Sequence, residues 1–524
     1  MRMSPLSLRI TAQRHGAELA VLAPAEGVSL RYADLMKRVA AMWAALRRRG
    51  VRLGPSARIA VRATNRVDTL VLLCALNEAA TPFVPLHPRL TPAEVSVLLA
   101  DAQPDHVVDE ATLSDLAQQP VTSQDLVDFA ALPLASNART LAILYTSGTS
   151  GMPKGALLPA AAFVASAIAS AQNLGWQPDD RWLLCLPLCH VGGLSIVTRC
   201  LLAAKALVLL PRADASSIVA AVDAQAVTLV SVVPTLLSAL LHEGQDHVLA
   251  RLRAVLSGGA ATPQPLYEHA LSRGLPVLRT YGLTEAYSQV TVGSYARAGQ
   301  RQPGSGWPLS GVELIIGPDS EDDPGLAPSA DVRAAGALPH APASVPYGQP
   351  GRIWLRGPTL MTGYLHRPAL AGGFFDTGDI GYLDAGFMSD RSADRGALHV
   401  LSRRTDLIVT GGENVYPAEV EAMLLGAPGV AAALVFGVED PVWGAQVAAA
   451  LVPLPDDSRA MDDPQRLQVL AEHIEGRLAS YKRPRLLGFV PRLPELGSGK
   501  PDRRRAAREL ADQLRPLPKV SSQR

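Results

Sequence analysis

The strongest constraint on the fold is the alternation of strand-like apolar runs with helix-like amphipathic segments over the first 300 residues. Residues 30–51 place apolar side chains at helical spacing and end in basic residues, which suits the helix dipole. A strand-like run at 57–63 and a helical pattern at 66–80 follow. Further strand-like runs lie at 106–109, 140–145, 181–187, 207–211, 227–233, 253–258 and 276–282. This alternation predicts an α/β fold with buried, largely parallel sheets.

The pattern changes after Ile316 and again after Arg403. Residues 317–347 are rich in Pro, Ala, Gly and Ser, which predicts an exposed insertion. Beyond Arg403 a compact α+β unit is predicted from strands at 406–412, 430–438 and 445–454 and from helices at 416–429 and near 464–481. We therefore predict a large domain over residues 1–403 and a small domain over residues 404–524.

Composition narrows the choice of partners. A chain of 524 residues is too long for a single hydrophobic core, and 48% of its residues are hydrophobic, which is enough to fill several cores. Lys and Arg total 49 against 48 for Asp and Glu, so charge gives no case for nucleic acid or an anionic membrane as the main partner.

The N-terminus lacks the apolar region of a signal peptide, and the most apolar later run is broken by Arg199 and Lys205. A soluble, cytoplasmic protein is expected, and a homodimer is retained as an expectation.

The chain has four cysteines, too few for a disulfide framework in a chain of this length. Cys185 and Cys189 are four residues apart, a spacing that could suggest a metal-binding pair. No second Cys/His pair with zinc spacing accompanies them. All four cysteines are therefore predicted to be buried thiols, which is in keeping with a reducing cytoplasm. They are Cys74, Cys185, Cys189 and Cys200.

A loop with the composition of a phosphate-binding site follows the strand-like run at 140–145. In "LYTSGTSGMPKGA" (144–156), glycines free the backbone so that amide groups can turn toward an anion. Lys154 adds a charge but follows Pro153, so the loop is not a Walker A sequence. Taken alone, the segment is equally compatible with a flexible surface turn. The candidate ligands are Thr146, Ser147, Gly148, Thr149, Ser150, Gly151 and Lys154.

The order of motifs along the chain decides between these readings. It resembles the adenylate-forming superfamily, which contains acyl- and aryl-CoA synthetases, peptide-synthetase adenylation domains and firefly-type luciferases. The matching segments, in the family's order over about the whole chain, are "YTSGTSGMPKG", "LPLCHVGGL", "SGGA", "YGLTEA", "DTGDIGYLD", "SRRTDLIVTGGENVYPAEVE" and "GSGKPDRR".

The resemblance implies a reaction and a fold. In this family the loop holds the β- and γ-phosphates of ATP while a substrate carboxylate attacks the α-phosphorus, so pyrophosphate leaves and an acyl-adenylate remains. Coenzyme A is then acylated. The implied fold has a large domain of stacked αβ sheets with a β-barrel-like subdomain and a small mobile α+β C-terminal domain. Thr284 is implied to bond the α-phosphate, and Glu285 to hold Mg²⁺, as carboxylates do together with phosphates.

The resemblance also assigns the remaining nucleotide ligands. Asp379 and Arg403 are implied to bind the ribose, and Lys500 to bridge the carboxylate and the α-phosphate, where a cation stabilises the developing charge. The hinge between the domains is implied at Arg404 and Thr405, although the family often has Asp or Lys where this chain has Thr405. The adenine and the rest of the nucleotide are implied to lie against Gly258, Gly259, Ala260, Tyr281 and Gly282.

Two stretches narrow the substrate. "LPLCHVGGLSIVTRCLLAAKALVLL" and "YGLTEAYSQVTV" resemble the o-succinylbenzoate–CoA ligases of menaquinone biosynthesis, whose substrate carries two carboxylates. Arg199 interrupts an apolar segment, so it should reach water, pair with a structural acid, or receive the second carboxylate. The implied acyl pocket comprises His190, Gly193, Arg199, Ser288 and Gln289, with His190 also a candidate catalytic residue.

Other functions stay open at this point. A medium-chain or aromatic acyl-CoA synthetase would carry the same ATP motifs. A free-standing adenylation protein that loads a carrier protein is a further alternative, although no carrier domain with its own Ser motif follows the last motif. A relative that only binds nucleotide is disfavoured because the ATP-facing motifs are intact.

Overall fold

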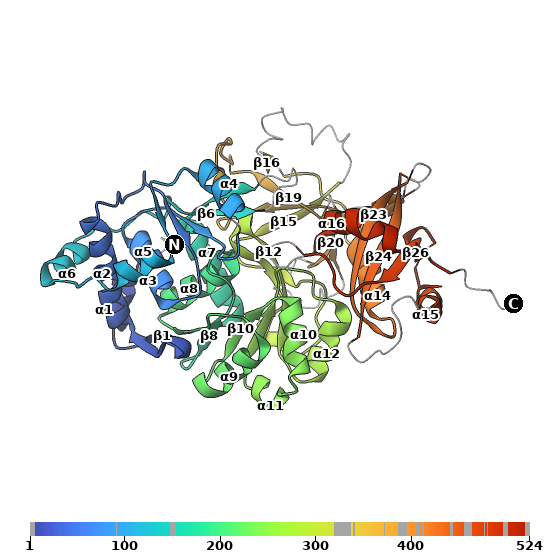
Figure 1. Ribbon diagram of the computed structural model, residues 1–524, viewed down its shortest axis with the longest axis horizontal. Coiled ribbons are helices and arrows are strands. Elements are labelled where there is room, and N and C mark those ends of the chain that lie inside the picture. Colours follow the sequence, from blue (N-terminus) through green and yellow to red (C-terminus); the bar gives the residue numbers. More distant parts are fainter. Residues whose placement is uncertain are drawn as a thin grey trace.

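The computed structural model describes residues 6–90, 92–146, 153–318, 337–338, 341–370, 372–385, 396–403, 406, 408–410, 413–440, 444–454, 464–475, 477–478, 480–495 and 501–518. Over these ranges it is a mixed α/β structure with a large N-terminal part and a small C-terminal part (Figure 1). Helices and strands alternate along most of the chain, which confirms the fold class expected from the sequence.

The largest sheet has nine strands, and those at its centre run parallel. Antiparallel strands close it at both edges. In order across the sheet the strands are β14 (Trp307–Pro308), β13 (Ser288–Val292), β12 (Val277–Leu283), β11 (Ala254–Ser257), β10 (Leu229–Val232), β8 (Arg181–Leu184), β9 (Ala206–Leu209), β1 (Leu19–Ala23) and β2 (Val28–Arg31).

A second, six-stranded sheet is parallel at β4, β3 and β5 and antiparallel at the hairpin that carries the phosphate-loop sequence. Its order is β18 (Gly363–Tyr364), β7 (Lys154–Pro159), β6 (Thr140–Thr146), β4 (Phe83–Leu86), β3 (Ile59–Arg62) and β5 (His106–Val108). The carboxyl ends of its parallel strands and of those in the nine-stranded sheet supply the loops discussed below.

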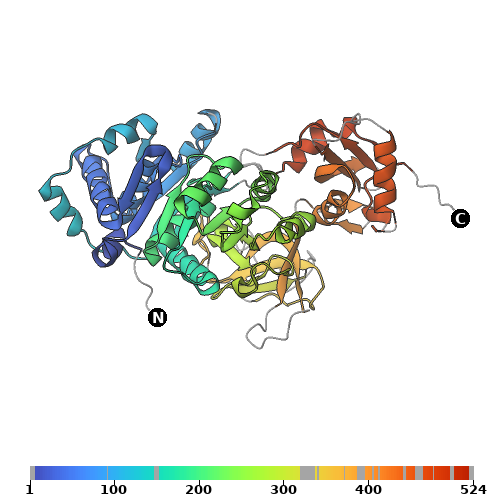
Figure 2. The same ribbon diagram turned by 90° about the horizontal axis from the view of Figure 1, so that it is seen from below.

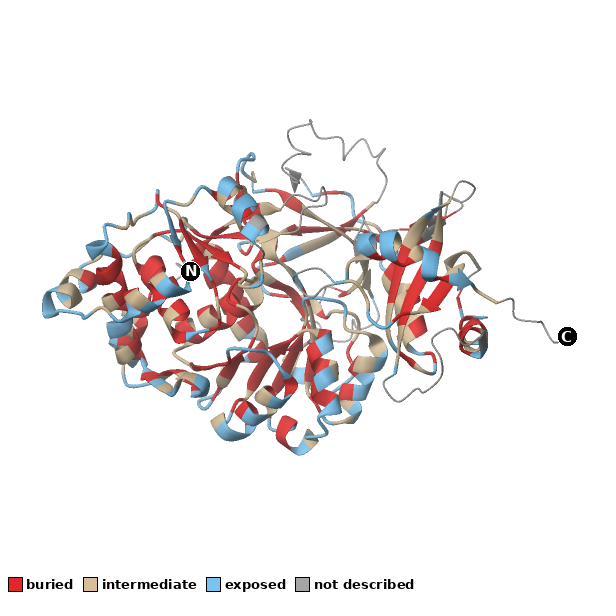
Figure 3. Ribbon diagram, viewed as in Figure 1, coloured by how far each residue is buried: buried red, intermediate tan, exposed pale blue. Residues whose placement is uncertain are grey.

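Helices fill the space between and around these sheets, and the interior strands are buried on both faces (Figure 3). In β11, Ala254 and Leu256 join one hydrophobic core while Val255 joins another on the opposite face. Continuous apolar strands are what a sheet covered on both faces requires. The helices of this part are α1 (Leu8–His15), α2 (Tyr32–Arg48), α3 (Val67–Glu78), α4 (Pro92–Ala102), α5 (Glu110–Ala117), α6 (Ser123–Ala130), α7 (Ala160–Leu174), α8 (Val191–Ala203), α9 (Ala215–Gln225), α10 (Pro234–His242), α11 (Asp246–Leu249) and α12 (Gln264–Ser272).

A five-stranded antiparallel sheet follows in sequence and corresponds to the expected barrel-like subdomain. It consists of β15 (Glu313–Gly317), β17 (Gly351–Arg356), β19 (Phe374–Asp384), β16 (Ala337–Leu338) and β20 (Ala397–Arg403). Most of the predicted insertion at 317–347 lies outside the described residues. The two residues of β16 belong to it and pair with Phe374 and Phe375 of β19.

The C-terminal part forms its own six-stranded sheet with helices on both faces (Figure 2). Its strands are β21 (Ile408–Thr410), β22 (Glu413–Val415), β23 (Val430–Asp440), β24 (Gly444–Pro453), β25 (Leu486–Phe489) and β26 (Arg515–Pro516), and its helices are α14 (Pro417–Leu425), α15 (Pro464–Ile474) and α16 (Arg503–Glu509). The helix predicted near 464–481 ends earlier, at Ile474, two residues before Gly476, a residue type that favours helix ends.

No helix in the described ranges combines the length and the apolar character needed to cross a lipid bilayer.

Candidate active site

The candidate site lies where the carboxyl ends of three strands meet. β6 ends at Thr146, β11 is followed by Gly258, Gly259 and Ala260, and β12 runs into the short 3-10 turn Thr284–Ala286. The hydroxyl of Thr146 donates a 3.3 Å hydrogen bond to Glu285 Oε1, so the two large sheets touch at this point. The structure therefore brings the phosphate-loop strand and the "YGLTEA" turn together, as open α/β sheets do at their ligand sites.

Glu285 is held from several sides. The phenol of Tyr364 donates to Glu285 Oε1 at 2.8 Å, and the backbone N–H of Met361 donates to the Glu285 carbonyl at 2.7 Å. Lys154 Nζ lies 5.5 Å from the centre of the Tyr364 ring. Burial, together with the charge of Arg367, lowers the pKa of Lys154, while the Glu285 carboxylate acts in the opposite direction. A fixed carboxylate with hydroxyl groups around it, beside a phosphate loop, fits the oxygen ligands that Mg²⁺ prefers.

The turn after β12 depends on a glycine. A Cβ on Gly282 would lie 1.9 Å from the carbonyl oxygen of Ser288, so β12 and β13 approach more closely here than any side chain allows. The register between the two strands shifts at Tyr281 and Gly282, which marks a bulge. The bulge allows the strand to leave the sheet and place Thr284 and Glu285 beside β6.

Asp379 lies opposite Arg403 in the antiparallel pair of β19 and β20. The phenol of Tyr281 donates a 2.6 Å hydrogen bond to Asp379 Oδ2 and thereby connects the nine-stranded sheet with the five-stranded one. The backbone N–H of Asp379 also donates to the Thr377 hydroxyl at 3.1 Å. The backbone thus brings the predicted ribose pair together; the side chain of Arg403 lies outside the described atoms.

The first turn of α8 is fixed against the loop that precedes it. A Cβ on Gly193 would lie 2.4 Å from the carbonyl oxygen of Pro187, so only glycine fits there. The buried Asn65 accepts a 3.0 Å hydrogen bond from the Leu188 N–H and donates to the Leu186 carbonyl at 3.1 Å. His190 occupies the N-cap position of α8, and its ring centre lies 5.5 Å from that of His87.

Arg199 is buried at the interface of α8 and β13, with an exposed fraction of 2%. Its NH2 group donates a 2.9 Å hydrogen bond to Gln289 Oε1, and its guanidinium carbon lies 5.1 Å from the centre of the Trp182 ring. Its Nε has no hydrogen-bond partner in the described part of the chain. Its burial shows that the expectation of a surface-exposed arginine is wrong, and no carboxylate among the described residues forms an ion pair with it.

Burial lowers the pKa of Arg199 to about 10, which leaves it cationic at neutral pH. An uncompensated buried charge is costly. The other predicted pocket residue of β13, Ser288, lies 3.5 Å from the Ser195 hydroxyl of α8. The structure therefore places Arg199, Ser288 and Gln289 at one helix–strand interface.

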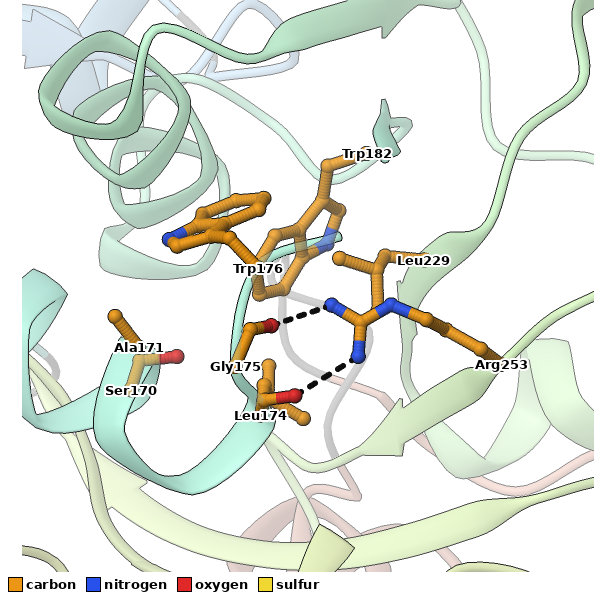
Figure 4. Close-up of a pocket in the computed structure, with 8 residues that line it drawn as sticks. All are labelled: Ser170, Ala171, Leu174, Gly175, Trp176, Trp182, Leu229 and Arg253. Carbon is orange, nitrogen blue, oxygen red and sulfur yellow. Dashed lines mark hydrogen bonds between the residues drawn. The ribbon is translucent and has the colours of Figure 1, made fainter. Parts of the chain in front are cut away.

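A small pocket in the large domain lies elsewhere. Arg253 donates to the carbonyls of Leu174 at 2.9 Å and Gly175 at 2.6 Å, next to Trp176 and Trp182 (Figure 4). Its strand residues stand at the amino ends of β8, β10 and β11, so the pocket opens at the edge opposite the strand ends that meet at Glu285. It is not the nucleotide site.

Several predicted site residues lie outside the described residues. These are Ser147, Gly148, Thr149, Ser150, Gly151, Arg404, Thr405 and Lys500. Conversely, sequence reasoning missed Tyr364, which bonds Glu285, and His87, which neighbours His190. Neither stands in a motif, and only their location at the ends of β18 and β4 brings them to the site.

Comparison with known proteins agrees with this geometry. The AMP-binding enzyme family matches residues 8–365, and its C-terminal domain matches residues 419–500. The chain belongs to the AMP-binding enzyme family. The 2-succinylbenzoate–CoA ligase of Bacillus licheniformis is 35% identical over 467 residues, which cover 86% of this chain and 89% of that protein.

Two solved structures of o-succinylbenzoate CoA synthetase from Bacillus subtilis are similar along nearly the whole chain. The complex with the acyl-adenylate intermediate is 28% identical with a TM-score of 0.82, covering 99% of this chain and 100% of that one. The complex with ATP and magnesium ion is 28% identical with a TM-score of 0.79, covering 96% and 99%. These matches confirm the two-part fold that the sequence motifs predicted.

Proposed function

We propose that this chain is an ATP-dependent o-succinylbenzoate–CoA ligase. It forms an acyl-adenylate with release of pyrophosphate and then transfers the acyl group to coenzyme A with release of AMP. The observation that carries the substrate is Arg199, a buried cation without an acidic partner among the described residues, which bonds Gln289 of the implied acyl pocket in a chain similar to ligases of this acid.

The residues at the strand ends divide the first half-reaction among them. Thr284 bonds the α-phosphate, and the loop from Thr146 to Lys154 holds the β- and γ-phosphates with backbone amides, hydroxyls and one ammonium group. Asp379 and Arg403 bind the ribose hydroxyls. Mg²⁺ held by Glu285 neutralises phosphate charge. Tyr364 and Thr146 support this role, since they fix the carboxylate of Glu285 at 2.8 and 3.3 Å.

Nucleophilic attack needs two anions to approach each other. Lys500 is proposed to lie between the substrate carboxylate and the α-phosphate, where its charge offsets their repulsion and stabilises the charge that develops at phosphorus. The oxygen of the carboxylate bonds to phosphorus as the bond to pyrophosphate breaks. In the second half-reaction the thiol sulfur of coenzyme A attacks the acyl carbon, and AMP departs with the bonding electrons.

The second carboxylate of o-succinylbenzoate is proposed to compensate Arg199. Gln289 Oε1 already accepts a hydrogen bond from Arg199, and the amide Nε2 of the same side chain is proposed to donate one to the substrate. The carboxylate therefore meets the guanidinium directly or through this amide. Charge-assisted hydrogen bonds of this type contribute about 1.5–3 kcal/mol.

The domain boundary is proposed to lie after Arg403, with a hinge at Arg404 and Thr405. Arg403 is the last residue of β20 in the five-stranded sheet, and Ile408 begins β21 in the C-terminal sheet. Rotation about a few residues between these strands would exchange the adenylating and the thioester-forming arrangements. A cytoplasmic location and a homodimer are part of the same proposal.

An assay of AMP release across a panel of carboxylates tests the function. With ATP, Mg²⁺ and coenzyme A, the highest kcat/KM is expected for o-succinylbenzoate, with release that requires coenzyme A. A preference for octanoate or benzoate would instead establish a medium-chain or aromatic acyl-CoA synthetase. Adenylate formation without transfer to coenzyme A would favour an adenylation protein that loads a carrier.

A further inference from the structure

Three side chains of metal-ligand type converge beside the proposed acyl pocket. One ligand atom from each of His87, Cys189 and His190 lies within 4.8 Å of the other two. The two imidazole rings are 5.5 Å apart between centres, with 41° between their planes. Cys189 is buried, and both histidines are partly buried. The cluster thus combines two imidazoles and a thiol in a small, sheltered volume.

The cluster is built by both large sheets. His87 directly follows β4 of the six-stranded sheet, whereas Cys189 and His190 end the loop that follows β8 of the nine-stranded sheet. The side chain of Asn65, which follows β3, fixes this loop through its bonds to Leu186 and Leu188. The three ligands are therefore held by rigid elements, and metal affinity depends on such ordered placement.

A cysteine binds a metal as its thiolate and a histidine as its neutral ring. A divalent cation would displace the thiol proton to solvent and form a metal–thiolate bond.

The hydrogen bond between Arg89 and His87 would respond to the metal. The N–H of Arg89 donates to His87 Nδ1 at 3.1 Å, which leaves the proton of the neutral ring on Nε2. Coordination through Nδ1 would replace this bond, and coordination through Nε2 would shift the ring to its other tautomer. Either change affects one hydrogen bond within a turn.

We propose that His87, Cys189 and His190 form a Zn²⁺ site with an open fourth position. Imidazole and thiolate are the donors that Zn²⁺ prefers, and three protein ligands with one exchangeable position are typical of its open sites. Mg²⁺ requires oxygen ligands and does not compete here. The ligase reaction needs Mg²⁺ and coenzyme A, so this zinc site is an additional one.

The position of the site gives it a consequence that rests on the proposed function. His190 stands at the N-cap of α8, where the acyl group is expected to lie. Zn²⁺ bound there would cover the pocket and would also attract the carboxylate of the substrate. Micromolar Zn²⁺ should therefore inhibit adenylation in the presence of excess Mg²⁺, and His87→Asn should remove this inhibition.

Direct zinc binding to the full-length, metal-free protein tests the site without turnover. In competition with a chromophoric chelator, the wild type should bind one equivalent of Zn²⁺ tightly. Loss of a supporting residue alone costs about 10–100-fold in metal affinity, so Cys189→Ser and His87→Asn should each weaken binding by at least about 100-fold. Cys185→Ser is the matched control, because Cys185 is equally buried but bonds the Ser231 carbonyl at 3.5 Å.

Absorption spectroscopy with Co²⁺ provides a second measurement. Bound at this site it should give thiolate-to-metal charge-transfer absorption in the wild type and in Cys185→Ser. Absence of this absorption in the wild type, or unchanged zinc affinity in Cys189→Ser, would overturn the site. Ligase turnover without zinc binding refutes this inference alone, and zinc binding without turnover on o-succinylbenzoate refutes the proposed function alone.

Discussion

Arg199 is the residue on which the proposed substrate preference depends. The residue is 2% exposed, and its guanidinium contacts one amide oxygen and one aromatic face, whereas Nε has no hydrogen-bond partner among the described residues. Burying a cation in this way is destabilising unless a bound anion compensates it. The arrangement favours a ligand with a second negative charge over a monocarboxylate.

Replacement of Arg199 by Ala should raise the KM for o-succinylbenzoate by about ten- to a hundredfold, since about 1.5–3 kcal/mol of binding is lost. The KM for ATP should stay constant. Octanoate and benzoate, which lack the second carboxylate, should be used as well as before or better. An equal loss of kcat/KM with both classes of acid would show that Arg199 supports the fold and does not bind the second carboxylate.

Asp379 allows a complementary test at the nucleotide. Asp379→Asn removes the charged acceptor of the proposed ribose site, which should raise the KM for ATP about tenfold and leave the KM for the acid unchanged. Asp384→Asn, five residues further along β19, is the control and should behave like the wild type. Steady-state kinetics with each substrate varied in turn would separate the two effects, and a change confined to the acid would refute the role.

At the scale of elements, the amino ends of the central strands are secured by a buried ion pair. Asp180 accepts from Arg253 at 2.6 and 2.7 Å, from the Thr228 hydroxyl at 2.8 Å and from the Gln177 N–H at 2.8 Å. Burial raises the pKa of Asp180, but these hydrogen bonds outweigh it and hold the pKa below its ordinary value. The pair connects the starts of β8, β10 and β11.

Asp180→Ala should lower the free energy of unfolding of the large domain by about 3 kcal/mol, because Arg253 would stay largely buried without its partner. Asp223→Ala, which breaks the exposed pair with Arg251, should cost less than about 1 kcal/mol. Urea unfolding of both variants measures the difference. Similar losses in the two variants would contradict the assignment.

The same pair predicts a pH dependence. A carboxyl group whose pKa is lower in the folded state stabilises that state. The stabilisation is complete above its pKa in the unfolded chain, about 4, and is lost as the pH falls toward its pKa in the folded state. The wild type should therefore lose more stability than Asp180→Ala between about pH 5 and pH 3. If thermal unfolding shows the same loss of stability in both proteins over this range, the Asp180 carboxylate does not contribute.

Periodicity predicted the elements themselves well. Helices α2 and α3 and strands β3, β5, β6 and β8 to β12 were expected from apolar spacing, because burial on one or both faces imposes that spacing, whereas β4 and β7 were not predicted. The contacts between sheets could not be predicted. The Tyr281–Asp379 and Tyr364–Glu285 bonds join residues 98 and 79 positions apart, and nothing in local spacing encodes such distances.

Motif order located the candidate site but not all of its chemistry. Thr146, Glu285 and Asp379 were assigned from the motifs; Thr146 ends β6, Glu285 lies in the turn after β12, and Asp379 lies within β19. Cys189 was predicted to be a buried thiol, which is confirmed, and His190 was named as a pocket residue, but the neighbouring His87 was missed. His87 is about a hundred residues away in sequence, so a search for short zinc spacings could not find it.

At the scale of the whole molecule, the two half-reactions should be separable. Lys500→Ala should abolish acyl-adenylate formation from ATP and acid, because the charge between carboxylate and α-phosphate is lost. Thioester formation from supplied adenylate should stay close to wild type, since the proposed rotation moves Lys500 away before coenzyme A attacks. Single-turnover assays of each step make the comparison, and equal impairment of both steps would refute the role.

The proposed boundary after Arg403 has a test of its own. The described strands of the five-stranded and C-terminal sheets do not pair with each other. Limited proteolysis should therefore cleave between residues 403 and 408 before it cleaves within either sheet, and N-terminal sequencing of the fragments locates the cut. First cleavage within β23 or β24 would place the boundary elsewhere.

The pairing of Asp379 with Arg403 across β19 and β20 would connect the proposed ribose site to the proposed hinge of the small domain. Arg403 is the last residue of β20, so a rotation just beyond it acts on the backbone partner of the proposed ribose ligand. Coupling between binding and conformation is reciprocal. If one orientation of the small domain binds AMP more tightly, bound AMP stabilises that orientation by the same free energy. A ligand that fixes the small domain, even far from the ribose, should therefore change the dissociation rate of AMP.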